Sequence, residues 1–359
     1  MGNKWQKKPF EKVFTVVTPP AKIKASEVLP EGVFPVVSQE SNFIDGYWNQ
    51  DSDVIKVDSP LVIFGDHTRI TKYVDFDFVQ GADGIKILRA SNEVVPRYLF
   101  YAIQNCNFKS LGYARHFKIL KKEEIVFPQS LEEQKRIVRI IDKAFEKIDA
   151  IRRNAEESLQ EAYELYQEGL RNAMLPQKSW ITVFLPDISE NLDSWRVPIT
   201  KSKRTPGKIP YYGASGIVDY VKDYIFDEPL LLISEDGANL LSRTTPIAFS
   251  ISGKTWVNNH AHILRFKNSV TQQFIEFLIA STNIEKFVTG TAQPKLNQQK
   301  MNSIPLVIPA DLEEQKKIVQ YLITLSNLCT QLEQNCQQIT VYCEEMKKAI
   351  LAKAFRGEL

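Results

Sequence analysis

The sequence predicts a duplicated α/β (α+β) fold, in which two mixed globular domains are separated by two long antiparallel coiled-coil helices. The octapeptide LEEQKRIV at 131–138 recurs as LEEQKKIV at 312–319. Each copy follows a proline, Pro128 or Pro309, and opens a long run with almost no Gly or Pro, which is typical of a helix start. Because chance rarely places one octapeptide at the start of two long helices, we infer an internal duplication.

Length and composition place the chain in an ordinary class. Its 359 residues suffice for two or three domains, and it is 43% hydrophobic and 25% charged, as soluble proteins are. A run of about 18 apolar residues, which a membrane-spanning helix needs, is missing from the sequence. The opening MGNKWQKKPF has lysines but lacks the apolar core of a secretory signal. We therefore expect a cytoplasmic protein that does not engage a membrane.

The four cysteines predict buried helix positions rather than a metal site. Cys329, Cys336 and Cys343 are seven residues apart, and Cys106 stands alone. This spacing matches neither a CxxC motif nor a zinc finger. Seven residues make two helical turns, so three thiols share one face of a helix.

Four segments follow from the duplication: a first globular domain at 1–128, a first spacer helix at 129–176, a second globular domain at 177–308, and a second spacer helix at 309–359. Their net charges are +2, −2, +3 and −1 respectively. The globular segments are thus the basic ones, which permits nucleic-acid binding there without establishing it.

The two globular segments share a plan although their sequences differ. Strands are expected at 57–65, 74–79 and 84–90, followed by a helix that starts at Pro96. In the second segment LLLISEDGANL corresponds to VIFGDHTRI, AHILRF to GIKILRA, and TQQFIEFLIAS to PRYLFYAIQ. The pattern indicates one fold with two different surface specificities.

A heptad spacing of apolar residues predicts a narrow seam along each long helix. The first seam contains Ile137, Ile141, Ile148, Ile151 and Leu165, and the second contains Ile318, Leu322, Leu325, Leu332, Ile339 and Met346. Small residues in the first seam (Ala144, Ala155, Ala162, Gly169) leave room for a close helix partner. About 45 residues form a rod of roughly 65 Å. If the domains lie at opposite ends of this rod, the helices are antiparallel.

Three motifs were tested as catalytic or cofactor sites, and none is convincing. Gly253-Lys254-Thr255 resembles the end of a phosphate-binding loop, but Ala248 stands where that loop needs glycine. Thr18-Pro19-Pro20-Ala21 lacks the aromatic residue of an amino-methyltransferase motif. The pair His260 and His262 has no acidic or cysteine cluster beside it in the sequence, so turn and strand-entry roles are favoured. We expect no catalytic residue, metal or cofactor.

What remains is recognition chemistry in polar loops. Asn and Gln can read adenine, Arg can read guanine, and Lys or Ser can hold phosphate. In the first domain the candidate DNA contacts are Ser38, Gln39, Asn42, His67, Thr68, Arg69, Tyr113, Arg115, His116 and Lys118. In the second domain they are Tyr211, Tyr212, Ser215, Asn239, Arg243, Gln293, Lys295, Asn297 and Gln298.

The whole chain resembles the DNA-specificity subunit of a type I restriction-modification system. The second half carries the resemblance in IPYYGASGIVDY, ISEDGAN, NNHAHIL and QPKLNQQKMNSIPLVIP. FVQGADGIKIL, the two LEEQK(R/K)IV helix openings and the terminal KAFRGEL complete it. The first domain departs from the family pattern, with FPVVSQES in place of IPYYGAS and FGDHT in place of SEDGA.

The resemblance implies a mechanism. Each target-recognition domain docks on one half of a bipartite double-stranded DNA target, and the coiled coil sets the distance between the halves. The helices bind two modification (adenine methyltransferase) subunits, and restriction subunits add ATP-dependent translocation and cleavage. The chain itself is then a non-catalytic subunit that binds no S-adenosylmethionine, ATP or metal.

Two alternatives from other classes remain open at this point. In the first, the chain is a coiled-coil structural or interaction protein without sequence-specific DNA binding, and the globular domains are scaffold. In the second, it is a freestanding DNA methyltransferase, which the missing cofactor motifs disfavour. Salt-dependent DNA binding distinguishes the first alternative, and methylation without a partner distinguishes the second.

Overall fold

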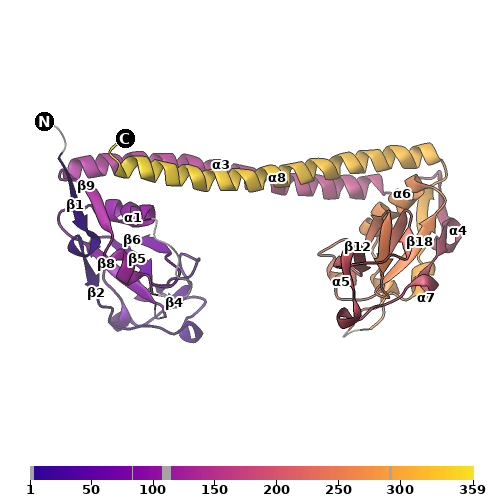
Figure 1. The fold of residues 1–359 in the computed structure, drawn as a ribbon, viewed down its shortest axis with the longest axis horizontal. Coiled ribbons are helices and arrows are strands. Elements are labelled where there is room, and N and C mark those ends of the chain that lie inside the picture. Colours follow the sequence, from indigo (N-terminus) through magenta and orange to yellow (C-terminus); the bar gives the residue numbers. More distant parts are fainter. Residues whose placement is uncertain (1–3, 83, 107–114, 291–292) are drawn as a thin grey trace. The chain divides into compact units, whose positions relative to one another are not determined.

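The computed structural model describes residues 4–82, 84–106, 115–290 and 293–359. The chain forms two compact units, residues 1–156 with 336–359, and residues 157–335. Each unit combines one α/β domain with part of both long helices, α3 (Leu131–Ala173) and α8 (Leu312–Phe355) (Figure 1). The predicted duplicated fold with two long helices is therefore confirmed.

The first α/β domain is built from short strands and a covering helix. Its strands are β1 (Trp5–Pro9), β2 (Phe14–Val17), β3 (Phe34–Val37), β4 (Gly46–Trp48), β5 (Leu61–Gly65), β6 (Thr71–Val74), β7 (Val79–Gln80), β8 (Ile85–Ala90) and β9 (Glu124–Pro128). Its α-helices are α1 (Pro96–Asn105) and α2 (Phe117–Leu120). The predicted strand at 74–79 is divided, with Val74 ending β6 and Val79 starting β7, because Asp75 and Asp77 interrupt the apolar run.

The second α/β domain repeats this plan with additional elements. Its strands are β10 (Trp180–Val183), β11 (Ser189–Asn191), β12 (Pro206–Gly213), β13 (Gly216–Val221), β14 (Phe226–Asp227), β15 (Leu230–Ser234), β16 (Ala248–Ile251), β17 (Lys254–Val257), β18 (Ala261–Phe266) and β19 (Leu306–Pro309). Its α-helices are α4 (Leu185–Ile188), α5 (Asn239–Ser242), α6 (Ser269–Ser281) and α7 (Gln298–Asn302).

Strand order shows the duplication more clearly than the sequence does. The central sheet has the order β2-β8-β5-β6 in the first domain and β11-β18-β15-β16 in the second. A smaller sheet has the order β4-β3-β7 in the first and β13-β12-β17-β14 in the second. The ribbon β1-β9 corresponds to β10-β19, and Trp5 and Trp180 lie opposite the prolines that precede the long helices.

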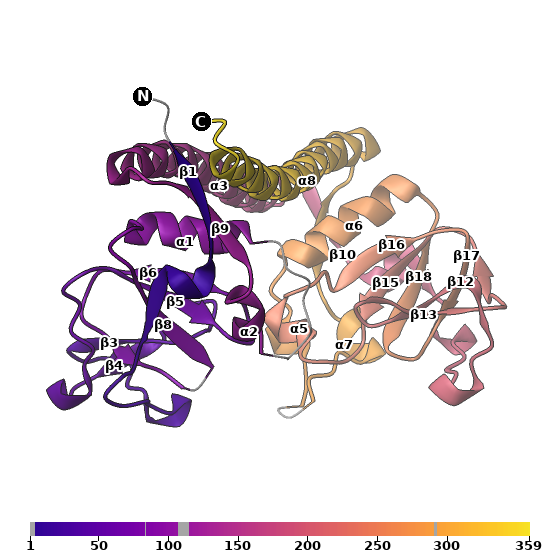
Figure 2. The same cartoon turned by 60° about the vertical axis from the view of Figure 1, so that its left-hand side comes forward.

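The middle strand of each central sheet is buried on both faces, as its continuous apolar run predicts. In the first domain Val62 and Phe64 pack in the core that contains α1 and the long helices, whereas Leu61 and Ile63 pack in a second core. Leu231 and Ile233 of β15 lie in the corresponding core beneath α6. The covering helix thus lies between the central sheet and the long helices (Figure 2).

The glutamine of the repeated octapeptide explains why that sequence occurs twice. Gln134 is fully buried, donates to the carbonyls of Glu93 and Pro128, and accepts from the amide of Val95, directly before α1. Gln315 donates to the carbonyl of Pro309 and accepts from the hydroxyl of Thr271 in α6. One buried amide therefore joins helix start, strand end and covering helix in each unit. Sequence reasoning noted the repeat but missed this role.

The long helices pack antiparallel within each unit. In the first unit the Cys343 thiol lies 3.6 Å from the carbonyl oxygen of Ile148, and Lys347 pairs with Asp149 at 2.6 Å. In the second unit the Cys329 thiol lies 3.3 Å from the carbonyl oxygen of Ala162. Cys329, Cys336 and Cys343 are all buried, which agrees with the sequence-based interpretation, and burial raises the pKa of the Cys329 thiol.

The seam prediction is only partly correct. Among the predicted seam residues Ile137, Ile141, Ile148 and Leu322 are buried, and Ile318, Leu325, Leu332 and Ile339 are half-buried. In contrast, Ile151, Leu165 and Met346 are 50%, 59% and 49% exposed. A heptad seam consists of two rows of residues. In the structure one row lies one residue further along the chain than predicted, so that Tyr166 and Lys347 make the contacts expected of Leu165 and Met346. Apolar residues flank the first row on both sides, so spacing alone did not reveal which side faces the partner helix.

Small seam residues do allow close helix approach. A Cβ atom on Gly169 would lie 2.6 Å from Leu325 Cδ1 and 3.1 Å from the hydroxyl oxygen of Tyr321. A larger residue at this position would therefore require the side chains of Leu325 and Tyr321 to shift.

Candidate nucleic-acid interface

In both domains the predicted recognition loops meet at one edge of the central sheet, where the middle strand ends. In the second domain the Glu235 amide donates to the carbonyl of His260 at 2.9 Å, and the Leu296 amide donates to the carbonyl of Glu235 at 2.7 Å. In the first domain the Asp66 amide donates to the carbonyl of Gly84 at 2.6 Å, and the His116 amide donates to the carbonyl of Asp66 at 2.8 Å. We call these two matched pairs of hydrogen bonds the loop framework.

A further loop joins the framework in each domain. The Ser234 hydroxyl donates to the carbonyl of Ala214, which ties the β12–β13 turn to the end of β15. In the first domain the Thr68 hydroxyl donates to the carbonyl of Gln39, and the Gln39 side chain accepts from the amide of His67. Both sets of loops are therefore held by bonds to the backbone.

Several predicted contacts of the first domain hold the loops instead of facing solvent. His116 is fully buried, with Nδ1 3.0 Å from the carbonyl oxygen of Asp66. Ser38 is 6% exposed and accepts from the amide of Glu40. Burial removes both from the set of candidate DNA contacts, and Gln39 is half-buried with its amide group engaged.

Other predicted residues of the first domain lie at the surface. Asn42 is exposed, and its carbonyl accepts from the Lys72 ammonium, whose pKa burial lowers. Thr68, Arg69, Arg115 and Lys118 are exposed, and His67 is half-buried. Arg69 has a positive φ of 63°, so the backbone at the loop tip is in the left-handed region. Tyr113 lies outside the described residues.

The predicted contacts on the β12–β13 hairpin differ in exposure. Tyr211 is 1% exposed, and its hydroxyl accepts from the amide of Ile199 at 2.9 Å. Its ring lies 4.4 Å from the Arg204 guanidinium carbon, so it supports the hairpin from inside and is removed from the candidate set. Tyr212 is half-buried against Phe249, and Ser215 is exposed at the turn.

Asn239 and Arg243 stabilise a loop of the second domain. The Asn239 carboxamide bonds to the backbone of Thr245 through both its oxygen and its nitrogen. The Arg243 guanidinium donates to the carbonyls of Ile279, Ala280 and Thr282. These carbonyls lie at the end of α6, where helix backbone acceptors lack intrahelical partners. Both side chains therefore have structural partners.

The segment at 293–297 and the adjacent Gln298 carry further exposed polar side chains of this domain. Gln293, Lys295 and Gln298 are exposed, whereas the Asn297 side chain accepts from the amide of Lys300 and caps α7. The amide of Gly237 donates to the carbonyl of Pro294, which fixes the segment beside the end of β15.

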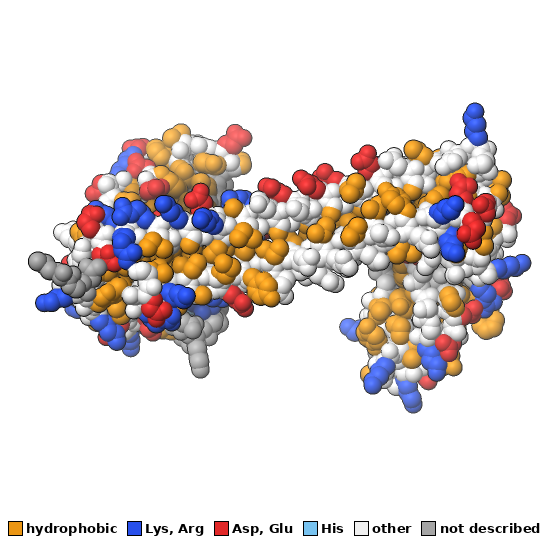
Figure 3. Space-filling view, turned by 90° about the horizontal axis from the view of Figure 1, so that it is seen from above, with side chains coloured by type: hydrophobic (Ala, Val, Ile, Leu, Met, Phe, Trp, Pro, Cys, Tyr) orange, Lys and Arg blue, Asp and Glu red, His pale blue; other side chains and the backbone are white. Residues whose placement is uncertain are grey.

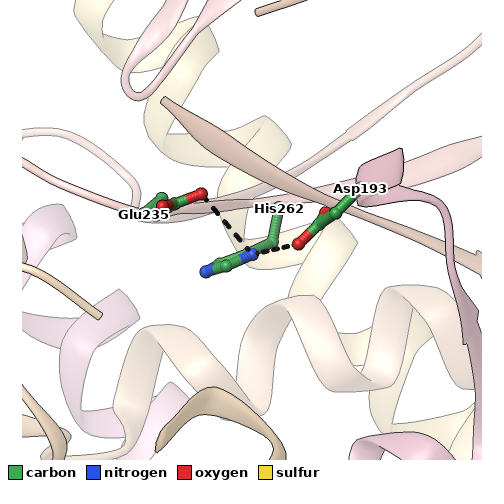
Figure 4. A group of neighbouring side chains, drawn as sticks. All are labelled: Asp193, Glu235 and His262. Carbon is green, nitrogen blue, oxygen red and sulfur yellow. Dashed lines mark hydrogen bonds and ion pairs between the residues drawn. The ribbon is translucent and has the colours of Figure 1, made fainter. Parts of the chain in front are cut away.

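A buried ion network beneath this segment was not predicted from the sequence. His262 Nδ1 lies 2.6 Å from Asp193 Oδ2 and 3.9 Å from Glu235 Oε2 (Figure 4). Arg196 pairs with Glu235 at 2.5 Å and Asp193 at 3.6 Å, and Lys295 pairs with Glu235 at 3.1 Å. Burial alone would raise the pKa of Asp193, but the hydrogen bond from His262 and nearby positive charge hold it below its usual value. The pKa of Glu235 is also lowered despite burial, by bonds from Arg196 and Lys295.

The donor set of this network does not suit a metal ion. Asp193, Glu235 and His262 could bring three ligand atoms within 4.8 Å of one another. However, both imidazole nitrogens already have oxygen partners, since Nε2 lies 2.7 Å from the carbonyl oxygen of Leu296. The Arg196 guanidinium supplies the positive charge that a cation would bring. The three side chains therefore belong to an ion-pair network.

The chain was compared with known protein families, and one family model matches it twice. The model of the type I restriction modification DNA specificity domain matches residues 2–161 and again residues 177–340. The chain belongs to this family. Each match includes one α/β domain and part of a long helix, so the family's role in DNA sequence specificity applies to both domains, which we now call the first and second specificity domains.

Two curated proteins are similar in sequence to this chain. A putative type I restriction enzyme specificity subunit of Haemophilus influenzae is 34% identical over 147 residues, which cover 41% of this chain and 37% of that protein. The EcoR124I/EcoR124II specificity subunit of Escherichia coli is 24% identical over 86% of this chain and 84% of its own length.

Two solved structures share the fold. A chain from a structure of the type I R-M system has a TM-score of 0.72 at 17% identity, covering 99% of this chain and 98% of its own. The HsdS subunit from Thermoanaerobacter tengcongensis has a TM-score of 0.56 at 17% identity, covering 99% and 97%. Within the described residues, none of the helices is long and apolar enough to cross a membrane.

Proposed function

We propose that this chain directs a type I restriction-modification complex to a bipartite DNA target, with one specificity domain reading each half-site. The observation that supports this most directly is the loop framework. It recurs bond for bond in both domains, while the exposed side chains that it carries differ. Arg115 and Lys295 occupy the same framework position, directly before His116 and Leu296. Two similar scaffolds with different exposed groups are suited to reading two different sequences.

The exposed residues of each loop set supply the chemistry of recognition. Arg115 and Gln293 carry the forked donors and acceptors that bind guanine and adenine edges in the major groove. Lys118, Lys295 and Ser215 suit phosphate oxygens, which position a protein on the duplex without reading sequence. Asn42, Thr68, Arg69 and Gln298 complete the exposed candidates, and His67 and Tyr212 contribute from half-buried positions.

The long helices act as a ruler between the half-sites. They contain 43 and 44 residues, and a helix of that length spans about 65 Å. Half-sites read on successive faces of DNA are separated by about 34 Å or a multiple of it. Helices of this length can bridge such a spacing, so the target contains a nonspecific spacer.

The long helices also recruit partner subunits. Leu165 and Met346 occupy equivalent positions of the repeat, one in each unit, and both are exposed. Hydrophobic side chains line the exposed face of the long helices in Figure 3, and such patches are typical of protein interfaces. Equivalent apolar surfaces in the two units match two modification (methyltransferase) subunits, one for each unit. These partners, together with restriction and translocase subunits, supply methylation and cleavage.

Methylome sequencing tests this function. Cells that express the modification subunit with this chain should gain a methylated motif of two specific parts separated by a fixed spacer. Cells that express the modification subunit alone should lack it. A motif that appears without this chain, or a continuous motif without a spacer, would contradict the proposal.

A further inference from the structure

Both ring nitrogens of His262 have an oxygen partner within hydrogen-bond distance. Its side chain is 1% exposed, with Nδ1 2.6 Å from the Asp193 carboxylate and Nε2 2.7 Å from the carbonyl oxygen of Leu296. A backbone carbonyl can only accept, so Nε2 carries a proton. A proton between Nδ1 and the Asp193 carboxylate makes the second hydrogen bond.

The surrounding groups keep Asp193 ionised rather than protonated. Its other oxygen accepts from the amide of Ile263 at 2.9 Å, and Arg196 lies 3.6 Å away. The charged groups that face His262 are Asp193 and Arg196 from the segment after β11, and Glu235 from the end of β15, which also binds Lys295. Their charges compensate one another, as buried charges must.

The His262 ring fixes the backbone of the recognition segment 293–297. The Leu296 amide donates to the carbonyl of Glu235, and the Leu296 carbonyl accepts from His262 Nε2. Lys295 is held through its ammonium by Glu235 and through its amide by the carbonyl of Thr289. Both backbone polar groups of Leu296 and the adjacent Lys295 side chain are thus connected to the same network.

We propose that the His262–Asp193–Glu235–Arg196 network is a positioning device that holds segment 293–297 in its DNA-reading conformation and so determines recognition of the second half-site. This inference rests on the proposed function. His262 is a positioning residue, because its side chain is buried and acts through Leu296. A site held within a few tenths of an ångström needs such a supporting layer of hydrogen bonds.

Among the described residues of the first specificity domain, the corresponding position has a different arrangement. Lys86 in β8 lies opposite Phe64, the penultimate residue of β5. In the same way, His262 in β18 lies opposite Ile233, the penultimate residue of β15. The Lys86 ammonium lies 5.7 Å from the Phe117 ring centroid, and the Asp66 carboxylate accepts directly from the Phe117 amide. Removal of His262 should therefore affect the second half-site alone.

The experiment uses the full chain in complex with its modification subunits and compares His262→Gln with wild type. Competition binding uses three DNA duplexes. The first contains the motif that methylome sequencing yields, the second has the first half of that motif scrambled, and the third has the second half scrambled. We expect His262→Gln to reduce discrimination against the scrambled second half at least tenfold, with discrimination against the scrambled first half unchanged. Lys86→Gln is the matched control and should leave the second half unaffected.

Hydrogen exchange gives a readout that does not depend on DNA. The Leu296 amide should exchange faster in His262→Gln than in wild type, whereas the His116 amide should be unchanged. If His262→Gln does not fold, Asp193→Asn, which keeps an acceptor oxygen beside His262, takes its place in both measurements with the same direction of change.

The outcomes separate the two proposals. A wild-type complex that binds all three duplexes equally contradicts the proposed function itself. Wild-type discrimination that His262→Gln or Asp193→Asn retains in full, with unchanged Leu296 exchange, overturns the positioning role.

Discussion

The two specificity domains hold their recognition loops by the same backbone bonds but support them with different side chains. In the first, Asp66 bonds directly to the start of α2, and Lys86 lies over an aromatic ring. In the second, Glu235 binds Arg196 and Lys295, and His262 lies at the position of Lys86. The framework is built from amides and carbonyls, which every sequence provides. The side chains beneath and above it are therefore free to diverge.

This difference shows how one fold can acquire two specificities. A backbone framework keeps the loop positions constant when surface residues change, so each domain can vary without disturbing the other. The openings of the two long helices differ less, because the buried Gln134 and Gln315 must each satisfy a fixed set of partners. The comparison suggests changes that affect one unit at a time.

The largest effect should come from replacing residues 1–128 with the first domain of another family member. We expect the first half-site to change completely and the second to be retained, because each domain has its own core. Methylome sequencing of the chimera measures both halves, and the reciprocal replacement of 177–308 is the control. A change in both half-sites would show that the domains do not read independently.

Next in size is a change in the length of the helices. Inserting one heptad into both α3 and α8 lengthens the coiled coil by about 10 Å. The spacer of the target should grow by about three base pairs, with both half-site sequences unchanged. Methylated motifs reveal the spacer directly. An unchanged spacer in a folded variant would refute the ruler.

The buried glutamines should differ in their effect on stability. Gln134→Leu leaves two carbonyls and one amide without a partner, which costs about 3 kcal/mol of unfolding free energy. Gln315→Leu leaves one carbonyl and one hydroxyl without a partner, so we expect the unfolding free energy to fall by about 2 kcal/mol. Denaturant unfolding measures both values. Gln160→Leu on the exposed surface of α3 is the control and should change stability by less than about 0.5 kcal/mol.

Arg115→Ala and Lys295→Ala test the framework position that the two domains share. Each should weaken recognition of its own half-site by about 1–3 kcal/mol if the side chain contacts a base. A side chain that contacts phosphate should instead lower affinity uniformly and reduce the salt dependence of binding. Binding titrations at several salt concentrations separate these results. A loss at the opposite half-site would contradict the domain assignment.

The smallest effect concerns the acid stability of the second domain. The pKa of Asp193 is lower in the folded chain than in the unfolded chain, so its ionised form stabilises the fold above pH 4 or so. That contribution disappears as the pH falls through the folded pKa. Asp193→Asn should therefore be less stable than wild type at pH 7, with the difference shrinking on acidification. Thermal melting across pH measures this, and a difference that grows in acid would contradict the sign.

Only part of the site could be predicted from the sequence. Residues such as Ser215, Gln293 and Lys295 are exposed, as polar turn residues usually are. Tyr211 and His116 are buried because distant segments cover them, and local composition carries no information about such coverage. The histidine pair at 260–262 showed no acidic neighbours in sequence, yet Asp193 comes from 69 residues earlier to meet His262.

The sequence by itself determined the duplication and the long helices, because repeats, helix starts and apolar periodicity are local signals. Tertiary structure alone decided which residues of the long helices are buried. Ile151 and Leu165 lie outside the helix contact although their spacing is regular, since the side from which the partner helix approaches depends on packing along the whole unit. It also decided that Gln134 and His262 are buried donors, because their partners lie far away in the chain.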